Sequence, residues 1–203
     1  MASARTPYPE AARELLRETI FGAARDQLEQ RAWSEITMAD IAQAAGVSRQ
    51  TLYNEFGNRN EFGLAFVIHE GERFLDGVEK AVLAHVDDPR AAIDAALVLF
   101  LHTAGEDPLI RLLLSDDGTG GMLPFVTTQG VPVVQWATAR LGAVIEEGWP
   151  QAPKRDVYLL SEALVRLAIS YITTPGDSPE QTATAVAELL GPFIDRALGT
   201  SAG

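Results

Sequence analysis

The sequence predicts an all-α protein with a small head and a larger body. Long stretches of its 203 residues are rich in Ala, Leu and Glu and place apolar residues at helical spacing, while no sustained alternating run indicates a sheet. A chain of this length can bury a substantial core. Because Cys is absent, disulfides, thiolate zinc sites and cysteine nucleophiles are excluded, and a reducing compartment fits best.

Three predicted helices form the head. The first runs from about residue 10 to 30 and carries one apolar stripe. A short second helix begins at Thr37, which heads a Thr-x-x-Asp pattern that resembles a capping box. Gly46 then interrupts the pattern where a tight turn needs a positive φ. Ser48 can cap a third helix that ends near Phe56, so the order is helix, turn, helix.

The remaining helices form the body. Asn58 and Glu61 make another cap signature, which opens a helix to about Ala84. Segments 115–121 and 173–179 are loops by their content of Gly, Asp and Pro. We expect further helices from Pro89, from Pro108, over 133–147, over 154–173 and over 179–198, the last with a kink or break at Gly191-Pro192.

The net charge of −12 is unusual for a nucleic-acid binder, which normally needs Lys and Arg for phosphate contacts. The charge is unevenly distributed, however. Residues 1–60 hold seven Arg and eight acidic residues, while the rest of the chain holds nine basic and twenty acidic residues. A nearly neutral head can present a local basic surface to DNA, whereas the acidic body would be repelled from it. Charge therefore permits DNA binding without arguing for it.

Residues 37–56, TMADIAQAAGVSRQTLYNEF, are the most informative segment. Their apolar positions would pack the two short helices against each other and against the first helix. The outer face keeps an arginine suited to guanine or phosphate and two amides suited to adenine edges, although such a face can also be merely solvated. Hydroxyls, capped helix starts and a second arginine can reach phosphates. The predicted DNA-binding residues are Thr37, Ser48, Arg49, Gln50, Thr51, Tyr53, Asn54 and Arg59.

The segment TMADIAQAAGVSRQTLYNEFGNRNEF resembles the tetracycline-repressor (TetR) family of transcription regulators. The resemblance lies in the Thr at the start of the second helix, the Ile-Ala pair, the Ala-Gly-Val turn and the Leu-Tyr followed by Phe. Family members commonly have Lys where this chain has Arg59, which implies a phosphate contact there. The resemblance also implies nine helices, a DNA-binding domain over 1–57, a ligand-binding and dimerisation domain over 58–203, and a twofold dimer on a palindromic operator.

The last two predicted helices are candidates for the dimer interface. The helix over 154–173 has one apolar line through Leu160 and Leu164 and another through Val165 and Ile169. A helix that faces only its own core needs one stripe, although a deeply buried helix can also show two. Since the resemblance implies a four-helix interface, we expect a homodimer, whose two heads could read half-sites about one turn of DNA apart.

An apolar ligand site is expected in the body, between the fourth and eighth helices. The candidates are mostly large apolar residues, and ordinary core packing is the alternative explanation for most of them. Two polar residues could orient a head group, but a hydrogen-bonded core histidine and a dimer salt bridge are the simpler interpretations. We expect a hydrophobic ligand, such as a fatty acid, a fatty acyl derivative or a hydrophobic drug. The candidate residues are Phe66, Phe100, His102, Ile110, Leu114, Phe125, Trp136, Tyr158 and Arg166.

The sequence thus predicts a repressor that a small effector releases from DNA, with no cofactor. A transcriptional activator or a regulator controlled by a protein partner is the alternative. An enzyme is disfavoured, because the three histidines lack metal-ligand spacing and no nucleophile elbow or phosphate loop is present. No stretch approaches the roughly 18 apolar residues of a membrane span, and the first residues lack a signal-peptide pattern, so we expect a cytoplasmic protein.

Overall fold

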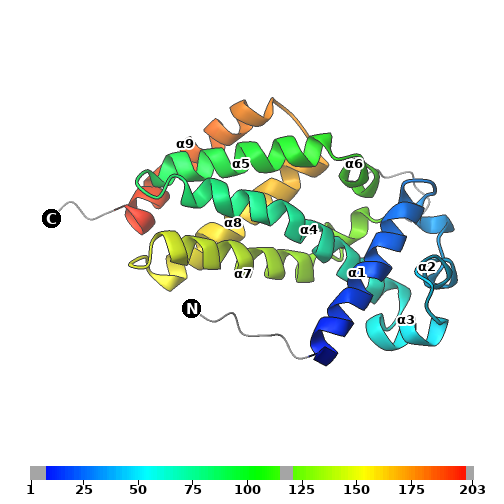
Figure 1. Cartoon of the computed structure of the whole chain (residues 1–203). Coiled ribbons are helices and arrows are strands. Elements are labelled where there is room, and N and C mark those ends of the chain that lie inside the picture. Colours follow the sequence, from blue (N-terminus) through cyan, green and yellow to red (C-terminus); the bar gives the residue numbers. More distant parts are fainter. Residues whose placement is uncertain (1–7, 115–120, 200–203) are drawn as a thin grey trace.

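The computed structural model describes residues 8–114 and 121–199, and over these residues it contains helices and no strands (Figure 1). The all-α prediction is confirmed. The helices are α1 (Tyr8–Leu28), η1 (Trp33–Glu35), α2 (Met38–Ala44), α3 (Arg49–Phe56), α4 (Arg59–Leu83), α5 (Pro89–Glu106), α6 (Pro108–Leu114), η2 (Leu123–Phe125), α7 (Val131–Gly148), α8 (Lys154–Thr173) and α9 (Pro179–Leu198).

The head lies at one end of the molecule, where α1 crosses between the pair α2 and α3 and the body (Figure 1). Its core is built from the apolar positions that the sequence pattern places inward. Ile20 of α1, Ile41 of α2 and Leu52 of α3 are fully buried against one another. Each of these side chains is removed from water at a gain of about 1.5 to 3 kcal/mol. The predicted packing of the two short helices on the first is confirmed.

The head core continues into the body. Phe62 and Phe66 of α4 stack on each other, and both contact the tilted ring of Phe21 of α1. Leu109 of α6 and Phe125 of η2 belong to the same cluster. The proposed domain boundary after residue 57 falls at the turn between α3 and α4, but apolar packing crosses it. The domain boundary therefore stays a prediction, and the head and the body share one apolar core.

The body is a bundle in which α5 packs on α4 and α9, while α7 packs on α4 and α8 (Figure 1). Its core includes Val82, Ala92, Ile145, Leu160 and Ile194, which are almost completely buried. Over the described residues, no helix combines the length and the apolar character that a membrane span requires.

Two details of the sequence predictions about the last helices change: the break at Pro192 and the meaning of the second apolar line of α8, while the predicted kink and dimer interface stay predictions. First, α9 runs unbroken through Pro192, so a break does not occur there. The carbonyl of Glu188, which the proline cannot bond, lies on an exposed turn where water can replace the missing donor. Second, both apolar lines of α8 are used within the chain: Leu160 lies in the bundle core, and Ile169 lines a cavity. The second line therefore does not by itself indicate a dimer interface.

Candidate DNA-binding face and apolar cavity

The turn between α2 and α3 has the geometry that its sequence predicts. Thr37 and Asp40 form a capping box: the Asp40 carboxylate accepts from the Thr37 backbone N–H at 2.8 Å, and the Thr37 hydroxyl accepts from the Asp40 N–H. Hydrogen bonds from Thr37 hold the pKa of Asp40 below its ordinary value. Gly46 has a φ of +68°, and the N–H of Val47 reaches back to the Ala42 carbonyl at 2.9 Å, which closes α2.

Ser48 begins α3 as predicted, since its hydroxyl oxygen accepts from the Thr51 N–H at 3.0 Å. The Ser48 and Thr51 hydroxyls also bond each other at 2.8 Å. Leu52 and Phe56 point inward and anchor the helix in the head core. The cap and the anchors fix both ends of α3, so its outer face is held rigidly.

The outer face of α3 gathers four of the predicted DNA-binding residues. Arg49, Gln50, Tyr53 and Asn54 are all exposed, and Tyr53 keeps 48 % of its surface in solvent. The Gln50 amide donates to the Asn54 side-chain oxygen at 2.7 Å, which aligns the two amides one turn apart. Along the part of the chain that the structure describes, Arg49 forms no ion pair. A guanidinium and two amides on one exposed helical face match the donor and acceptor pattern of a major groove.

A clamp between α1 and α3 was not predicted from the sequence. Glu55 of α3 accepts from Arg13 at 2.9 Å and from Arg17 at 2.7 Å, and the Arg17 guanidinium lies 4.6 Å from the centre of the Phe56 ring. Burial alone would raise the pKa of Glu55, but the hydrogen bonds from the two arginines hold it below its ordinary value. Opposite charges 38 and 42 residues apart give no local sequence signal, so only the folded chain reveals the clamp.

Arg59 occupies a different environment from the one predicted. Its guanidinium donates to the carbonyls of Trp33 and of Ile36, the latter at 3.2 Å, and stacks 4.2 Å from the centre of the Trp33 indole. Burial lowers its pKa. The side chain therefore joins α4 to η1 within the head. A phosphate contact by Arg59 stays a prediction, and it would have to compete with these bonds.

A buried ion pair joins the head to the body. Glu70 of α4 is only 2 % exposed and accepts from Arg25 of α1, while Arg73 lies 3.5 Å from the same carboxylate oxygen. Burial and the nearby charge of Arg73 lower the pKa of Arg25. Among the described residues, Glu70 is thus the carboxylate that both guanidinium groups contact, while Asp107, Glu29 and Asp26 act on Arg25 through their charge. Burying Glu70 without a partner would be costly, so the pair fixes α1 against α4.

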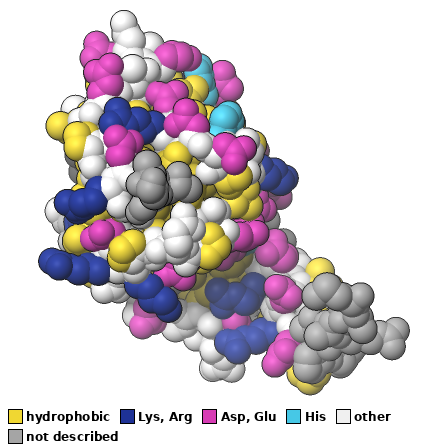
Figure 2. Space-filling view, turned by 90° about the vertical axis from the view of Figure 1, so that its left-hand side faces the viewer, with side chains coloured by type: hydrophobic (Ala, Val, Ile, Leu, Met, Phe, Trp, Pro, Cys, Tyr) yellow, Lys and Arg dark blue, Asp and Glu magenta, His cyan; other side chains and the backbone are white. Residues whose placement is uncertain are grey.

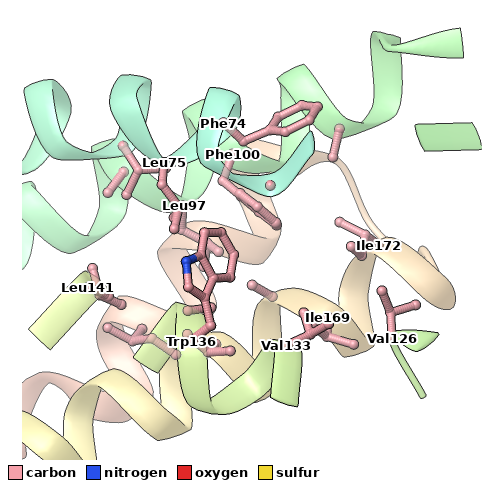
Figure 3. Close-up of a pocket in the computed structure, with 18 of the residues that line it drawn as sticks. Phe74, Leu75, Leu97, Phe100, Val126, Val133, Trp136, Leu141, Ile169 and Ile172 are labelled. Atoms are coloured by element: carbon pink, nitrogen blue, oxygen red, sulfur yellow. The ribbon is translucent and has the colours of Figure 1, made fainter. Parts of the chain in front are cut away.

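An apolar cavity of about 150 Å³ lies in the body, between α4, α5, α7 and α8 (Figure 3). Trp136 projects into its middle, and Phe74 and Phe100 lie along one side (Figure 3). The described residues of its wall include no charged and no hydroxyl-bearing side chain. Gly71 makes room for the indole, since a Cβ there would lie 2.9 Å from the Trp136 ring. A cavity of this size and lining excludes water and favours apolar occupants.

Three of the predicted ligand residues line this cavity: Phe100, Ile110 and Trp136. The apolar spacing of α4 through Val67, Gly71 and Val78 would have indicated its wall, but only Phe66 was chosen from that helix. The side chain of Leu114 lies outside the described residues. The other five candidates, which lie away from the cavity, are Phe66 and Phe125 in the head core, Tyr158 on the surface, His102 paired with Glu180, and Arg166 paired with Glu162.

No group of three or more His, Asp or Glu side chains within 8–114 and 121–199 could hold a metal ion. The cavity and the face of α3 are therefore the two candidate sites. The two sites are connected through α4, because this helix lines the cavity and also holds α1 of the head through Glu70.

Comparisons with known proteins identify both parts of the chain. Residues 20–65 match a family model described as bacterial regulatory proteins of the tetR family. Residues 88–192, more than half of the chain, match a model described as the C-terminal domain of the bacterial tetracyclin repressor. The first match covers the helix-turn-helix region, and the second covers most of the body.

Individual relatives agree with these matches. The HTH-type transcriptional regulator AlkX of Mycobacterium tuberculosis is 36 % identical over 192 residues, which cover 95 % of this chain and 91 % of that protein. The crystal structure of the TetR family repressor AlkX from a Dietzia strain, implicated in biodegradation of n-alkanes, aligns with a TM-score of 0.77 and 33 % identity over 90 % of this chain and 96 % of that one. A TetR-family regulator from Streptomyces coelicolor shares the fold, with a TM-score of 0.57 and 16 % identity over 95 % of this chain and 99 % of that one.

The capped helix-turn-helix, the helical body and the relatives that span nearly the whole chain all point to one class of protein. A family that regulates transcription through DNA binding is not enzymatic, in agreement with the sequence prediction. This chain belongs to the TetR family of bacterial transcriptional regulators.

Proposed function

We propose that this regulator is a repressor that binds a palindromic operator as a dimer and is released by a small hydrophobic effector. The main support for the proposed DNA-binding surface is the outer face of α3. Arg49, Gln50, Tyr53 and Asn54 lie exposed on a helix whose start, inner side and final turn are all fixed by the head. A helix held in this way can enter a major groove without losing much conformational entropy.

The dimer is proposed to form through α8 and α9. Support comes from apolar side chains that the single chain leaves in solvent: Leu189 of α9 is 73 % exposed, and Tyr158 and Leu159 of α8 are 56 % and 40 % exposed. Exposed apolar side chains on adjoining helices indicate an interaction surface. We therefore expect a dimer on this face because of these exposed residues, and no longer because of the second apolar line of α8.

The acidic body supports an orientation on DNA in which only the head makes contact. Residues 61–203 hold nine basic and twenty acidic residues, and Figure 2 shows Asp and Glu side chains, with Lys and Arg among them, on the left-hand side of the molecule as drawn in Figure 1. A phosphate backbone repels such a surface, so the complex is favoured only with the head against the groove. We place this activity in the cytoplasm, where bacterial DNA lies.

The cavity supports a hydrophobic effector, and one relative is a repressor implicated in biodegradation of n-alkanes. An occupant of the cavity would touch α4 at Val67 and Gly71, in the same turn that holds the head contact at Glu70. If the occupied cavity prefers a different placement of α4, the effector lowers operator affinity by its differential binding to the two states.

The test is binding of the purified protein to DNA from its own upstream region over a salt series, measured by fluorescence anisotropy. Gln50→Ala and Asn54→Ala should each weaken specific binding about tenfold or more, because a bidentate amide–adenine pair contributes about 1 to 3 kcal/mol. Non-specific binding should not change. Gln151→Ala, at an exposed glutamine between α7 and α8, is the matched control.

Two results would contradict the proposal. If selection from random DNA also gives no specific sequence, α3 is not a reading helix. If decan-1-ol at saturating concentration leaves operator affinity unchanged, the cavity does not control DNA binding. A reporter gene measured with and without the protein then distinguishes a repressor from an activator.

A further inference from the structure

The flank of α3 that carries Thr51 and Glu55 presents a carboxylate where a DNA backbone would come close. The two residues are four apart, so they lie on one side of the helix, about 100° round from Gln50 and Asn54. A helix with its side chains is about 10 to 12 Å wide and the major groove is about 12 Å wide, so a helix in the groove has a phosphate backbone along each flank. An unbalanced carboxylate on that flank would oppose the DNA binding proposed for α3.

Arg17 of α1 already balances this carboxylate. Its Nη1 lies 2.7 Å from Oε1 of Glu55. The same guanidinium lies 4.6 Å from the ring centre of Phe56 and 5.4 Å from that of Phe21, within the range of cation–π attraction. These three contacts fix Arg17 in the head. One arginine is therefore enough to neutralise the flank of α3.

Arg13 adds a second positive charge at the same place. Its side chain is 64 % exposed and lies one turn before Arg17, at the end of α1 that Figure 1 shows beside α3. Its bonds of 2.9 and 3.0 Å to Glu55 both come from Nε. Within the described residues its two terminal nitrogens form no hydrogen bond, and residues 1–7 contain no acidic side chain. A guanidinium can bind two phosphate oxygens through such an edge.

The other acidic residues of this part of α1 do not remove the excess charge. Glu14 and Glu18 lie about 100° round the helix from Arg13 and Arg17, and Glu18 is 3.6 Å from His69. Glu10 lies on the side of Arg13, but it is exposed and forms no ion pair with the described residues, so water and salt screen its charge. Two guanidinium groups thus face one carboxylate beside α3.

We propose that Arg13 binds a phosphate of the DNA backbone along this flank of α3, while Arg17 keeps Glu55 neutral. The contact would lie on the first helix, outside the helix-turn-helix. It carries no sequence information, but it fixes how α3 sits in the groove and adds the positive charge that an acidic protein needs there. This inference rests on the proposed function and extends its DNA-binding surface to α1.

The experiment measures binding of the full-length protein to two DNA duplexes of equal length, its own upstream region and an unrelated sequence, by fluorescence anisotropy over a salt series. On both duplexes, Arg13→Gln should reduce the slope of log K against log salt by about 0.9 for each bound protomer. A fourfold rise in salt should then cost the variant about 3.5-fold less affinity than it costs the wild type. Arg13→Lys keeps the charge and should keep the slope. Lys80→Gln, at an exposed lysine of α4, is the charge-matched control.

The outcomes separate this inference from the function on which it rests. If Arg13→Gln keeps the wild-type slope, Arg13 does not bind phosphate and the inference is wrong, while selective binding by the wild type still supports the repressor. If the variant loses affinity for the upstream DNA alone, Arg13 positions α3 through Glu55, and the inference is also wrong. If the wild type prefers no sequence, the proposed function fails even where the slope changes. A wild-type protein that binds neither duplex overturns both. Thermal unfolding shows that each variant is folded.

Discussion

The ion pair between Glu70 of α4 and Arg25 of α1 adds to the apolar packing that holds the head against the body. In Glu70→Leu the Arg25 side chain, which is 22 % exposed, would face Arg73 with no carboxylate between them. Removing one partner of a fully buried pair costs about 3 to 5 kcal/mol, and residual access to water should reduce this cost to about 2 to 3 kcal/mol. That is a large share of the stability of about 5 to 15 kcal/mol that is typical of a folded protein.

The assay is urea unfolding, followed by circular dichroism at one fixed protein concentration because a dimer's stability depends on it. Arg25→Leu, Glu70→Leu and the double variant complete a double-mutant cycle. The double variant should recover most of the loss, since apolar residues of similar size can replace a buried pair. Glu72→Leu, at an exposed neighbour on α4, should change stability by less than about 0.5 kcal/mol. A Glu70→Leu protein as stable as wild type would refute the reasoning.

Three further changes test the turn, the cavity and a surface pair. Gly46→Ala should cost about 1 kcal/mol in thermal unfolding, because φ is +68° while the space around a Cβ is open, so only the backbone resists. Gly71→Leu should abolish decan-1-ol binding, because the new side chain must take the space of the Trp136 ring and of the ligand; retained alcohol binding would place the ligand elsewhere. His102→Ala should return the pKa of Glu180 from about 2 toward 4.5, because the hydrogen bond from His102 is the largest cause of the lowering. In the wild type, ionised Glu180 contributes stability above pH 4.5 that is lost as the pH falls toward 2. In the variant this contribution is absent, so its stability should depend less on pH over this range. NMR titration of the carboxyl group and acid unfolding measure the two effects.

The helix starts were predictable because their determinants are local. Thr37, Ser48 and Asn58 each cap a backbone N–H at most three residues away, so the sequence contains both partners within one turn. The same holds for Gly46, whose positive φ follows from a tight turn between two short helices. Pro192 is the contrary case: a proline rule predicts a kink or a break, and packing of α9 on α5 excludes the break, while a kink stays a prediction.

The environment of a side chain was predictable only where the apolar pattern of its helix separates an inward face from an outward face. Gln50 and Asn54 lie outward because Leu52 and Phe56 lie inward, which the pattern of α3 already indicates. Arg59 could not be placed in this way, because its partners are carbonyls 23 and 26 residues away in sequence, and backbone acceptors have no sequence signature. Charge alone therefore could not distinguish a phosphate contact from an internal bond.

One turn of α4 brings the cavity and the head together. Val67 and Gly71 line the cavity, while Glu70, which lies between them in sequence, holds Arg25 of α1. Successive residues of a helix point about 100° apart, so a single turn can contact two neighbours on different sides. Because close-packed interiors transmit displacement, a ligand that shifts this turn also displaces the carboxylate that anchors α1. Arg13 and Arg17 of α1 in turn bind Glu55 of α3. The cavity and the outer face of α3 are therefore connected through two ion-pair contacts, at Glu70 and at Glu55, and a substitution can break each of them separately.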